Sequence, residues 1–341
     1  MTPTGEFPEA ELGQNGRGQN GGGQNGRGQI GTVADAPSGN WVDRWAPAAS
    51  RPYLRLSRAD RPIGTWLLLL PCWWGLALAA TVDGWRLYDL WIFVACGLGA
   101  ALMRGAGCTW NDITDRKFDA AVARTRSRPI PSGQVSVRQA LVWMALQTAA
   151  SGAILWTFPP VAIGLAVASL ALVAIYPFAK RFTWWPQVFL GLAFNWGVPV
   201  AWAAHTGAFP PLAPWVLYLA GIAWTLFYDT IYAHQDKEDD ALIGVKSTAR
   251  LFGAATGRWL SGFLVVTVVA MAAAVMMALL PVASGLKLTV ALAGPWMLGW
   301  HLLWQLRLLD PDDPALCLRL FRSNRDAGFL PALFFAAAAF L

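Results

Sequence analysis

Charged residues, cysteine and histidine are all scarce in this chain of 341 residues. Asp, Glu, Lys and Arg make up only 13% of it, against about 25% in soluble domains. Its four cysteines show neither the spacing of a metal site nor a disulfide framework. A soluble fold and a cysteine-based centre are therefore not expected. Hydrophobic residues make up 56% of the chain, which is typical of a membrane protein.

Long uncharged runs fill most of the chain after residue 60. A helix that crosses a bilayer needs about 20 apolar residues, so the runs at 139–179 and 182–228 must each hold two spans. Double prolines divide both runs, in "FPPVA" and "GAFPPLAP", because proline removes a backbone donor and ends a helix. The remaining runs lie at 62–82, 90–103, 259–286, 288–306 and 327–341. The sequence predicts an all-α, polytopic membrane protein with about nine transmembrane helices.

Lysine and arginine fall almost entirely on one side of these predicted spans. Of the 26 cationic residues, only Arg86 and Lys287 lie in the opposite connections. The positive-inside rule then places the amino terminus in the cytoplasm. The net charge of +6 is explained by this asymmetry beside an anionic lipid bilayer, so no nucleic-acid partner is needed.

Residues 1–50 differ in composition from the rest of the chain. They include a repeat of Gly, Gln and Asn with too little apolar surface to form a core, so we expect a disordered cytoplasmic tail before a transmembrane domain at 51–341. Glu6, Glu9 and Glu11 argue against an acid-poor transit peptide, and no cleaved signal is evident. These features favour the inner membrane of a bacterium.

Two acidic clusters stand out against the apolar background. In "TWNDITDRKFDAAVARTRSRPIPSG" (109–133), Asn111, Asp115 and Asp119 recur every four residues, and Asp112 is close by. In "YDTIYAHQDKEDDALIGVKSTARLFG" (228–253), Asp236 and Asp240 have the same helical spacing. Both clusters follow predicted spans on the same side of the membrane.

The ligand types in these clusters point to a magnesium diphosphate site. Carboxylates are the hard oxygen ligands that Mg²⁺ prefers, and the expected metal ligands are Asp112, Asp115, Asp119, Asp236 and Asp240. Cations such as Arg124, Arg128 and Lys246 are interspersed among them and suit a phosphate-bearing ligand. A solvated, charged loop is the simpler alternative for either cluster alone.

The same residues resemble the UbiA superfamily of intramembrane prenyltransferases. "NDITDRKFD", "RTRSRPIPSG", "YDTIYAHQDKEDD" and "GVKSTARLFG" occur in the family's order. "RADRPIGTWLLLLPCWW" (58–74) and "YPFAKRFTWWPQVFLGLAFNWG" (176–197) look like the branch that prenylates 4-hydroxybenzoate in ubiquinone synthesis. The resemblance implies helices around a central cavity, with Mg²⁺ bridging the two acidic motifs to a polyprenyl diphosphate at its mouth.

The resemblance also implies roles for single residues. Asp115, Asp119, Asp236 and Asp240 would promote cleavage of the allylic C–O bond, and the ring carbon ortho to the acceptor's hydroxyl would attack. The residues expected to bind a substrate are Arg181 for the acceptor carboxylate, Lys180 and Arg58 as further candidates for it, Arg124, Arg128 and Lys246 for the diphosphate, and Asn111 and Asn195. Alternatively, Lys180 and Arg181 only mark the membrane interface, and Asn195 only hydrogen-bonds a neighbouring helix.

Two other functions remain open from the sequence. Another enzyme of the superfamily, such as a haem O synthase or one with a homogentisate or dihydroxynaphthoate acceptor, shares the acidic motifs. A membrane transporter would place ionisable residues along a pathway through the spans. Here nearly all acids cluster at one membrane face, which favours catalysis there.

Overall fold

The computed structural model describes residues 36–37, 39–121, 125–242, 244–281 and 284–341. Within these ranges all regular structure is helical, which confirms the predicted all-α class. The first 35 residues of the expected tail lie outside the described ranges.

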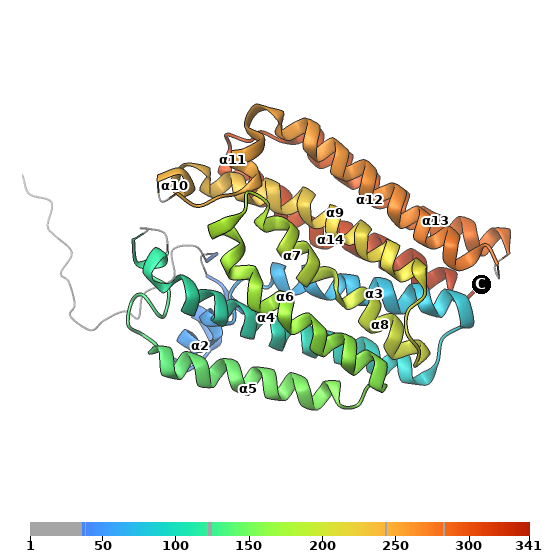
Figure 1. Ribbon diagram of the computed structural model, residues 1–341, viewed down its shortest axis with the longest axis horizontal. Coiled ribbons are helices and arrows are strands. Elements are labelled where there is room, and N and C mark those ends of the chain that lie inside the picture. Colours follow the sequence, from blue (N-terminus) through green and yellow to red (C-terminus); the bar gives the residue numbers. More distant parts are fainter. Residues whose placement is uncertain (1–35, 38, 122–124, 243, 282–283) are drawn as a thin grey trace, which may run out of the picture. The chain divides into compact units, whose positions relative to one another are not determined.

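The long helices are α3 (Ile63–Asp83), α4 (Leu87–Ala121), α5 (Val137–Leu155), α6 (Pro160–Phe182), α7 (Pro186–Asn195), α8 (Gly197–Thr206), α9 (Leu212–Ala233), α12 (Thr256–Leu279), α13 (Gly285–Leu308) and α14 (Pro314–Ala338). The short ones are α1 (Trp41–Trp45), α2 (Arg51–Leu56), η1 (His234–Asp236), α10 (Lys237–Leu242), α11 (Thr248–Phe252) and η2 (Gly253–Ala255). The long helices lie side by side, with α2, α10 and α11 at one end (Figure 1).

Six helical segments of the described chain are long and apolar enough to cross a membrane. They are Ile63–Asp83, Leu87–Ala121, Pro160–Phe182, Pro186–Thr206, Leu212–Asp236 and Thr248–Leu279. The predicted total of about nine is therefore not confirmed. The helices α5, α13 and α14 are long enough, but their composition is more polar, and each packs against another long helix.

Helices α3, α9 and α14 meet in a core built around two buried tryptophans. The rings of Trp74 and Trp224 lie 4.9 Å apart between centroids. Each indole N–H has a partner on α14, because Trp74 donates to the carbonyl of Gly328 at 2.7 Å and Trp224 to Oδ1 of Asn324 at 3.0 Å. Satisfying these donors removes the cost of burying them. The core fixes α9, which leads directly into the second acidic cluster in η1 and α10, relative to α3.

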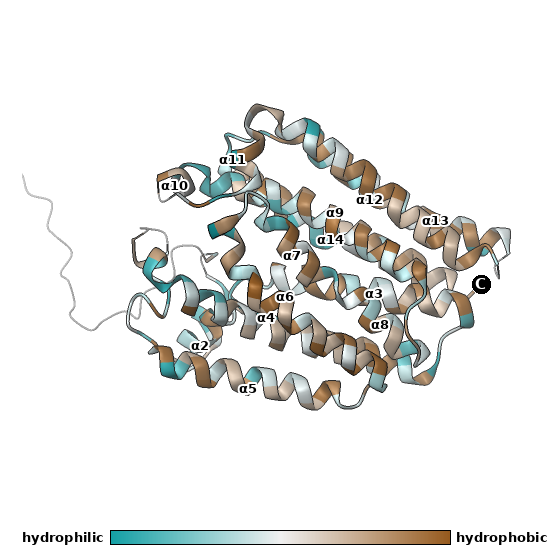
Figure 2. Ribbon diagram, viewed as in Figure 1, coloured by the Kyte–Doolittle hydropathy of each residue, from teal (hydrophilic) through white to brown (hydrophobic). Residues whose placement is uncertain are grey.

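The longest helix, α4, carries the first acidic cluster at its carboxyl end. Its 35 residues extend for about 52 Å at 1.5 Å per residue, whereas the hydrocarbon core of a bilayer is about 30 Å thick. The last turns of α4 therefore extend beyond the apolar layer. Hydrophilic segments gather mainly at this end, near α2 and α10 (Figure 2).

Residues 41–45 form part of the folded unit, although the sequence analysis assigned residues up to 50 to a tail. Asp43 of α1 forms an ion pair of 2.7 Å with the buried Arg55, and Trp41 donates to the carbonyl of Ala59 at 2.7 Å. Burial raises the pKa of Asp43, but hydrogen bonds from Arg55 and Asn40 lower it more, so the pKa lies below its usual range. The boundary of the domain therefore lies before residue 41.

Candidate active site

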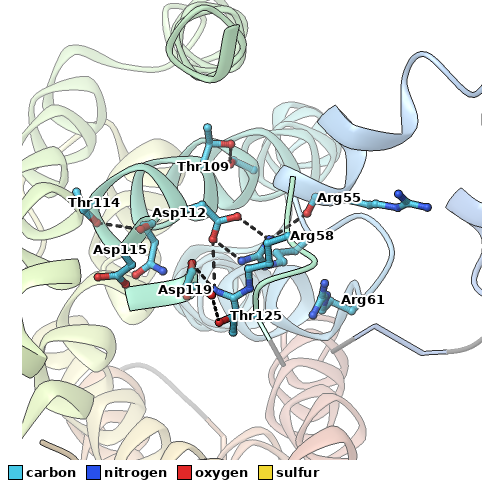
Figure 3. A network of polar contacts seen from close by, with 12 residues as sticks. Arg55, Arg58, Arg61, Thr109, Asp112, Thr114, Asp115, Asp119 and Thr125 are labelled. Atoms are coloured by element: carbon cyan, nitrogen blue, oxygen red, sulfur yellow. Dashed lines mark hydrogen bonds and ion pairs between the residues drawn. The ribbon is translucent and has the colours of Figure 1, made fainter. Parts of the chain in front are cut away.

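The three aspartates of the first cluster lie on α4 and are almost completely buried. Asp112, Asp115 and Asp119 are 0%, 1% and 7% exposed. A buried carboxylate is costly unless it is paired, and each of these three has a basic partner from another part of the chain. Figure 3 shows the three aspartates, with Arg58 beside Asp112.

Arg58 holds Asp112 from the turn between α2 and α3. Its two Nη atoms donate to the two carboxylate oxygens of Asp112 at 2.9 and 2.5 Å, in the bidentate fork that suits a carboxylate. Arg58 is also the one non-glycine residue with positive φ among the described residues, at 56°. A backbone conformation that L-residues rarely adopt therefore aims this guanidinium at Asp112.

Arg128 links two members of the cluster. Its Nη1 lies 3.0 Å from both oxygens of Asp119 and 3.6 Å from an oxygen of Asp112. Because Arg128 reaches α4 from the connection to α5, the segment 125–129 is folded back over the acidic cluster. The Thr125 hydroxyl, which donates to the carbonyl of Asp119 at 2.9 Å, supports the same fold-back.

The end of α6 supplies the two cations that face Asp115. Lys180 forms an ion pair with one oxygen of Asp115, and Nη2 of Arg181 lies 3.3 Å from the other. The guanidinium of Arg181 also lies over the rings of Phe178 and Phe118, at 5.0 and 5.4 Å from their centroids. Lys180 lines the polar cavity described next, whereas Arg181 is absent from its lining.

A polar cavity of about 270 Å³ brings the two acidic clusters together. From the first cluster it is lined by Asn111, Asp119 and Arg128, and from the second by Asp236 and Lys246. The sequence assigned all of these residues to one site. The cavity opens at the end of the helices where the polar segments gather.

An apolar cavity of about 360 Å³ adjoins the polar one, because Asn111, Arg128, Tyr176 and Tyr232 line both. The rest of its wall is mostly hydrophobic and comes from helices α3 to α8; examples are Leu68, Ala100, Phe158, Val173, Phe194 and Val200. A polar head and an apolar tail of one ligand could therefore occupy the two cavities together.

A third pocket, of about 160 Å³, adjoins the other two cavities and shares lining residues with each. Tyr176 and Tyr232 line all three spaces, and Asp229 lines the polar cavity and this third pocket. Arg104 lines the third pocket and the apolar cavity. The sequence analysis gave none of these four a role. Arg104 and Asp229 carried a signal for one, since they directly follow the apolar runs at 90–103 and 182–228 and an ionisable residue within a membrane helix is rarely there without a function.

Some predicted site residues lie apart from these cavities or cannot be placed. Asn195 is fully buried between α7 and α9, where its amide donates to the carbonyl of Gly191 at 2.9 Å and to the Thr225 hydroxyl at 2.8 Å. It lines none of the three spaces, so its hydrogen bonds join helices. Arg124 and the side chain of Asp240 lie outside the described part of the chain.

The acidic clusters fit a metal ion by donor type. Within the described residues, no three Asp, Glu, His or Cys side chains lie close enough together to hold one. Asp119 and Asp236 nevertheless line one cavity, and carboxylate oxygens are the ligands that Mg²⁺ prefers. Asp112 and Asp115 do not line this cavity, and basic side chains engage both oxygens of each.

Sequence comparison confirms the family resemblance. The model of the UbiA prenyltransferase family matches residues 68–336. The mitochondrial 4-hydroxybenzoate polyprenyltransferase of Bos taurus is 48% identical over 84% of this chain and 74% of its own length. The protein of the same name from Homo sapiens is 45% identical over the same shares of the two chains.

Solved structures share the fold. A UbiA homolog from Archaeoglobus fulgidus bound to DMAPP and Mg²⁺ superposes with a TM-score of 0.63 at 21% identity, over 84% of this chain and 97% of its own. An apo UbiA homolog from Aeropyrum pernix K1 has a TM-score of 0.62 at 22% identity, over 80% and 96% of the two chains.

The predicted bacterial inner membrane, with the amino terminus in the cytoplasm, is wrong by this comparison. The curated relatives are mitochondrial proteins of eukaryotes. Hydropathy and the distribution of lysine and arginine identify a bilayer and its two sides, but they carry no information on which membrane it is.

Proposed function

The chain belongs to the UbiA prenyltransferase family, and we propose that it transfers a polyprenyl group to 4-hydroxybenzoate as a step of ubiquinone biosynthesis. The donor is a polyprenyl diphosphate, and the new bond forms at the ring carbon ortho to the hydroxyl. Relatives that are 45 to 48% identical over most of this chain carry that activity in their names.

The joined polar and apolar cavities are the observation that carries this proposal. The acids and cations around the polar cavity suit a diphosphate, and the apolar cavity beside it suits a hydrocarbon chain. A transporter site has no need of this pairing of two unlike spaces, which matches the two chemically unlike ends of one substrate. The apolar wall would also keep water away from an allylic carbocation until the aromatic ring attacks it.

The cofactor in this proposal is Mg²⁺, as named for the Archaeoglobus fulgidus homolog. The residues that would hold it are Asp115, Asp119, Asp236 and Asp240, and the bound ion would neutralise charge on the diphosphate leaving group. Arg124, Arg128 and Lys246 would bind phosphate oxygens. Asp112 would orient Arg58 and Arg128, because its oxygens are engaged by Arg58.

The acceptor's carboxylate also needs a partner, because an unpaired charge is costly in a cavity among helices. Arg181 and Lys180 are the proposed partners, as the family resemblance implies. They are supported by their ion pairs with Asp115 and, for Lys180, by its place in the lining of the polar cavity. The membrane in this proposal is a mitochondrial one, as for the curated relatives.

The test is a transfer assay with the full chain in liposomes. Polyprenyl diphosphate is supplied with 4-hydroxybenzoate, homogentisate or dihydroxynaphthoate, with Mg²⁺ or with a chelator. Prenylation of 4-hydroxybenzoate that requires Mg²⁺ is expected. Preference for another acceptor would assign the chain to a different branch of the family. Absence of transfer to every acceptor, in protein that is inserted and folded, would reject the proposal.

A further inference from the structure

Asp229 is the one carboxylate in the lining of the polar cavity for which the described residues supply no hydrogen bond or ion pair. It lies on α9 and faces both the polar cavity and the third pocket. Among the described residues, no hydrogen bond or ion pair engages its oxygens. Arg104, Tyr176 and Tyr228 lie within electrostatic reach of it but form no ion pair or hydrogen bond with it. A carboxylate inside a membrane helix bundle is costly without a partner, so we expect a ligand to supply one.

The depth of Asp229 separates it from the proposed metal site. It precedes Asp236 by seven residues, which is about 10 Å along a helix. Tyr176 likewise lies one turn before Lys180, and Asn111 one turn before Asp115. The cavity therefore has an outer layer of acids and cations and an inner layer made of Asn111, Tyr176, Asp229 and Tyr232.

The position of the reacting atoms follows from these two layers. A diphosphate held by the outer layer directs its allylic carbon inward, toward the apolar cavity that takes the prenyl chain. The aromatic ring must reach the same carbon. The three spaces meet at Tyr176 and Tyr232, and Asp229 lies at that junction.

We propose that the carboxylate of Asp229 is the catalytic base of the transfer, an inference that rests on the proposed function. The allylic C–O bond breaks, and its electron pair leaves with the diphosphate. A π electron pair of the ring forms the new C–C bond and leaves a ring cation that still carries a proton on the alkylated carbon. Asp229 takes this proton, and the C–H electron pair restores aromaticity. The protonated carboxyl then gives the proton to water at the open mouth.

Other groups near the junction are less suited to this step. Tyr176 and Tyr232 are neutral phenols, which are weak proton acceptors. Asp119 is paired with Arg128, and Asp236 lies in the outer layer with the diphosphate. Asp229 alone combines a carboxylate, the inner position and oxygens that no other described residue engages.

The test compares Asp229→Asn and Asp229→Glu with the exposed control Asp326→Asn on α14. Positioned bases contribute about 10²- to 10⁴-fold, so we expect Asp229→Asn to lose that much turnover and Asp229→Glu to recover part of it. The acceptor is used with hydrogen or deuterium at both carbons ortho to its hydroxyl. The isotope effect should rise above that of the wild type in Asp229→Asn, because proton removal then limits the rate.

Cleavage of the allylic C–O bond is measured separately, by the exchange of an oxygen label between the bridging and non-bridging positions of the prenyl diphosphate. Exchange should persist in Asp229→Asn, because the base acts after ionisation. Full turnover of Asp229→Asn, an unchanged isotope effect, or loss of exchange together with transfer would each overturn the proposal. If the wild type shows exchange but prenylates no aromatic acid, the proposed function fails and the base fails with it. A wrong proposed function is therefore detected in the wild type, whereas a wrong assignment of Asp229 as the base is detected only in the variants.

Discussion

Each of the three aspartates near the carboxyl end of α4 forms an ion pair with a basic side chain from another part of the chain. Arg58, Arg128 and Lys180 pair with Asp112, Asp119 and Asp115. Such pairs offset the cost of burying the carboxylates. They also hold cations at the edge of a cavity where a diphosphate with Mg²⁺ would compete for both partners. The three aspartates of α4 are thus paired with cations before the substrate binds.

Arg181 allows a test of the acceptor site at the level of one side chain. If it binds the acceptor's carboxylate, Arg181→Ala should raise KM for 4-hydroxybenzoate about 10- to 150-fold, since a charged hydrogen bond contributes about 1.5 to 3 kcal/mol. KM for the prenyl diphosphate should change much less. Steady-state kinetics with each substrate varied in turn measures both.

The opposite pattern would show that Arg181 serves Asp115 instead. The two side chains are 3.3 Å apart, so loss of the arginine could disturb the metal ligand. A larger effect on kcat, or on KM for the prenyl diphosphate, would contradict the acceptor assignment. Arg319→Ala, an exposed arginine on α14, is the matched control.

Residue spacing predicted which acids share a face, but it could not predict their partners. The four-residue recurrence of Asn111, Asp115 and Asp119 is a property of a helix, so it can be read from the sequence. The pairing of Asp112 with Arg58 joins residues 54 positions apart through an unusual backbone conformation. For Asn195, the sequence left open whether it binds a substrate or hydrogen-bonds a neighbouring helix, and the structure shows the bond to Thr225 on α9.

At the scale of helices, α7 and α9 approach each other closely at Gly221. A Cβ on Gly221 would collide with the side-chain amide of Asn195, which is held by Gly191 and Thr225. We predict that Gly221→Ala destabilises the protein by about 1 to 3 kcal/mol, the usual cost of overpacking. Thermal unfolding in detergent measures the change.

Gly262→Ala is the control for this substitution. Gly262 also lies within a long helix, α12, but nothing lies within 4 Å of its Cβ position. Alanine is a better helix former than glycine by about 0.5 to 1 kcal/mol, so this variant should be at least as stable as the wild type. Equal melting temperatures for the two variants would refute the packing explanation.

Helix boundaries followed the prolines where these come in pairs. The break predicted at 158–162 separates α5 from α6, and the one predicted at 207–214 separates α8 from α9. The break between α7 and α8 was not predicted. Pro199 lacks the N–H that would bond to the carbonyl of Asn195, so the helix is interrupted at Trp196. A single proline inside an apolar run does not reveal such an interruption.

At the scale of the whole molecule, α1 is the first helix of the described chain, and it is tied to the membrane domain by the ion pair of Asp43 with Arg55. We predict that deletion of residues 1–35 leaves transfer within a few fold of the full chain. Deletion of residues 1–46 should lower the melting temperature, because the buried Arg55 loses its ion pair with Asp43, a contact worth about 1.5 to 3 kcal/mol. Thermal unfolding and the liposome assay compare the two truncations. Loss of activity in the shorter deletion would show that residues 1–35 are functional.

Composition predicted the membrane environment and the helical class, but not which membrane contains the protein. Apolar runs indicate which segments can lie in the hydrocarbon core of a bilayer, and the distribution of lysine and arginine indicates on which side of it each connection lies. Neither depends on the organelle. The number of spans could not be predicted from the sequence either, because α5, α13 and α14 are long but more polar than the other spans. Such segments are stabilised by packing against other helices.

The central claim is that acids from α4 and from η1, which directly follows α9, act as one site that ionises a prenyl diphosphate. Asp115→Asn and Asp236→Asn each remove one negative charge with little change of shape, and Asp326→Asn is the control. Transfer is measured at saturating prenyl diphosphate and limiting Mg²⁺. Each single variant should lose about 10²-fold or more, and the double variant should be little worse than the weaker single one, because groups that act as a unit are not additive. Near wild-type turnover in both single variants would contradict the two-cluster site.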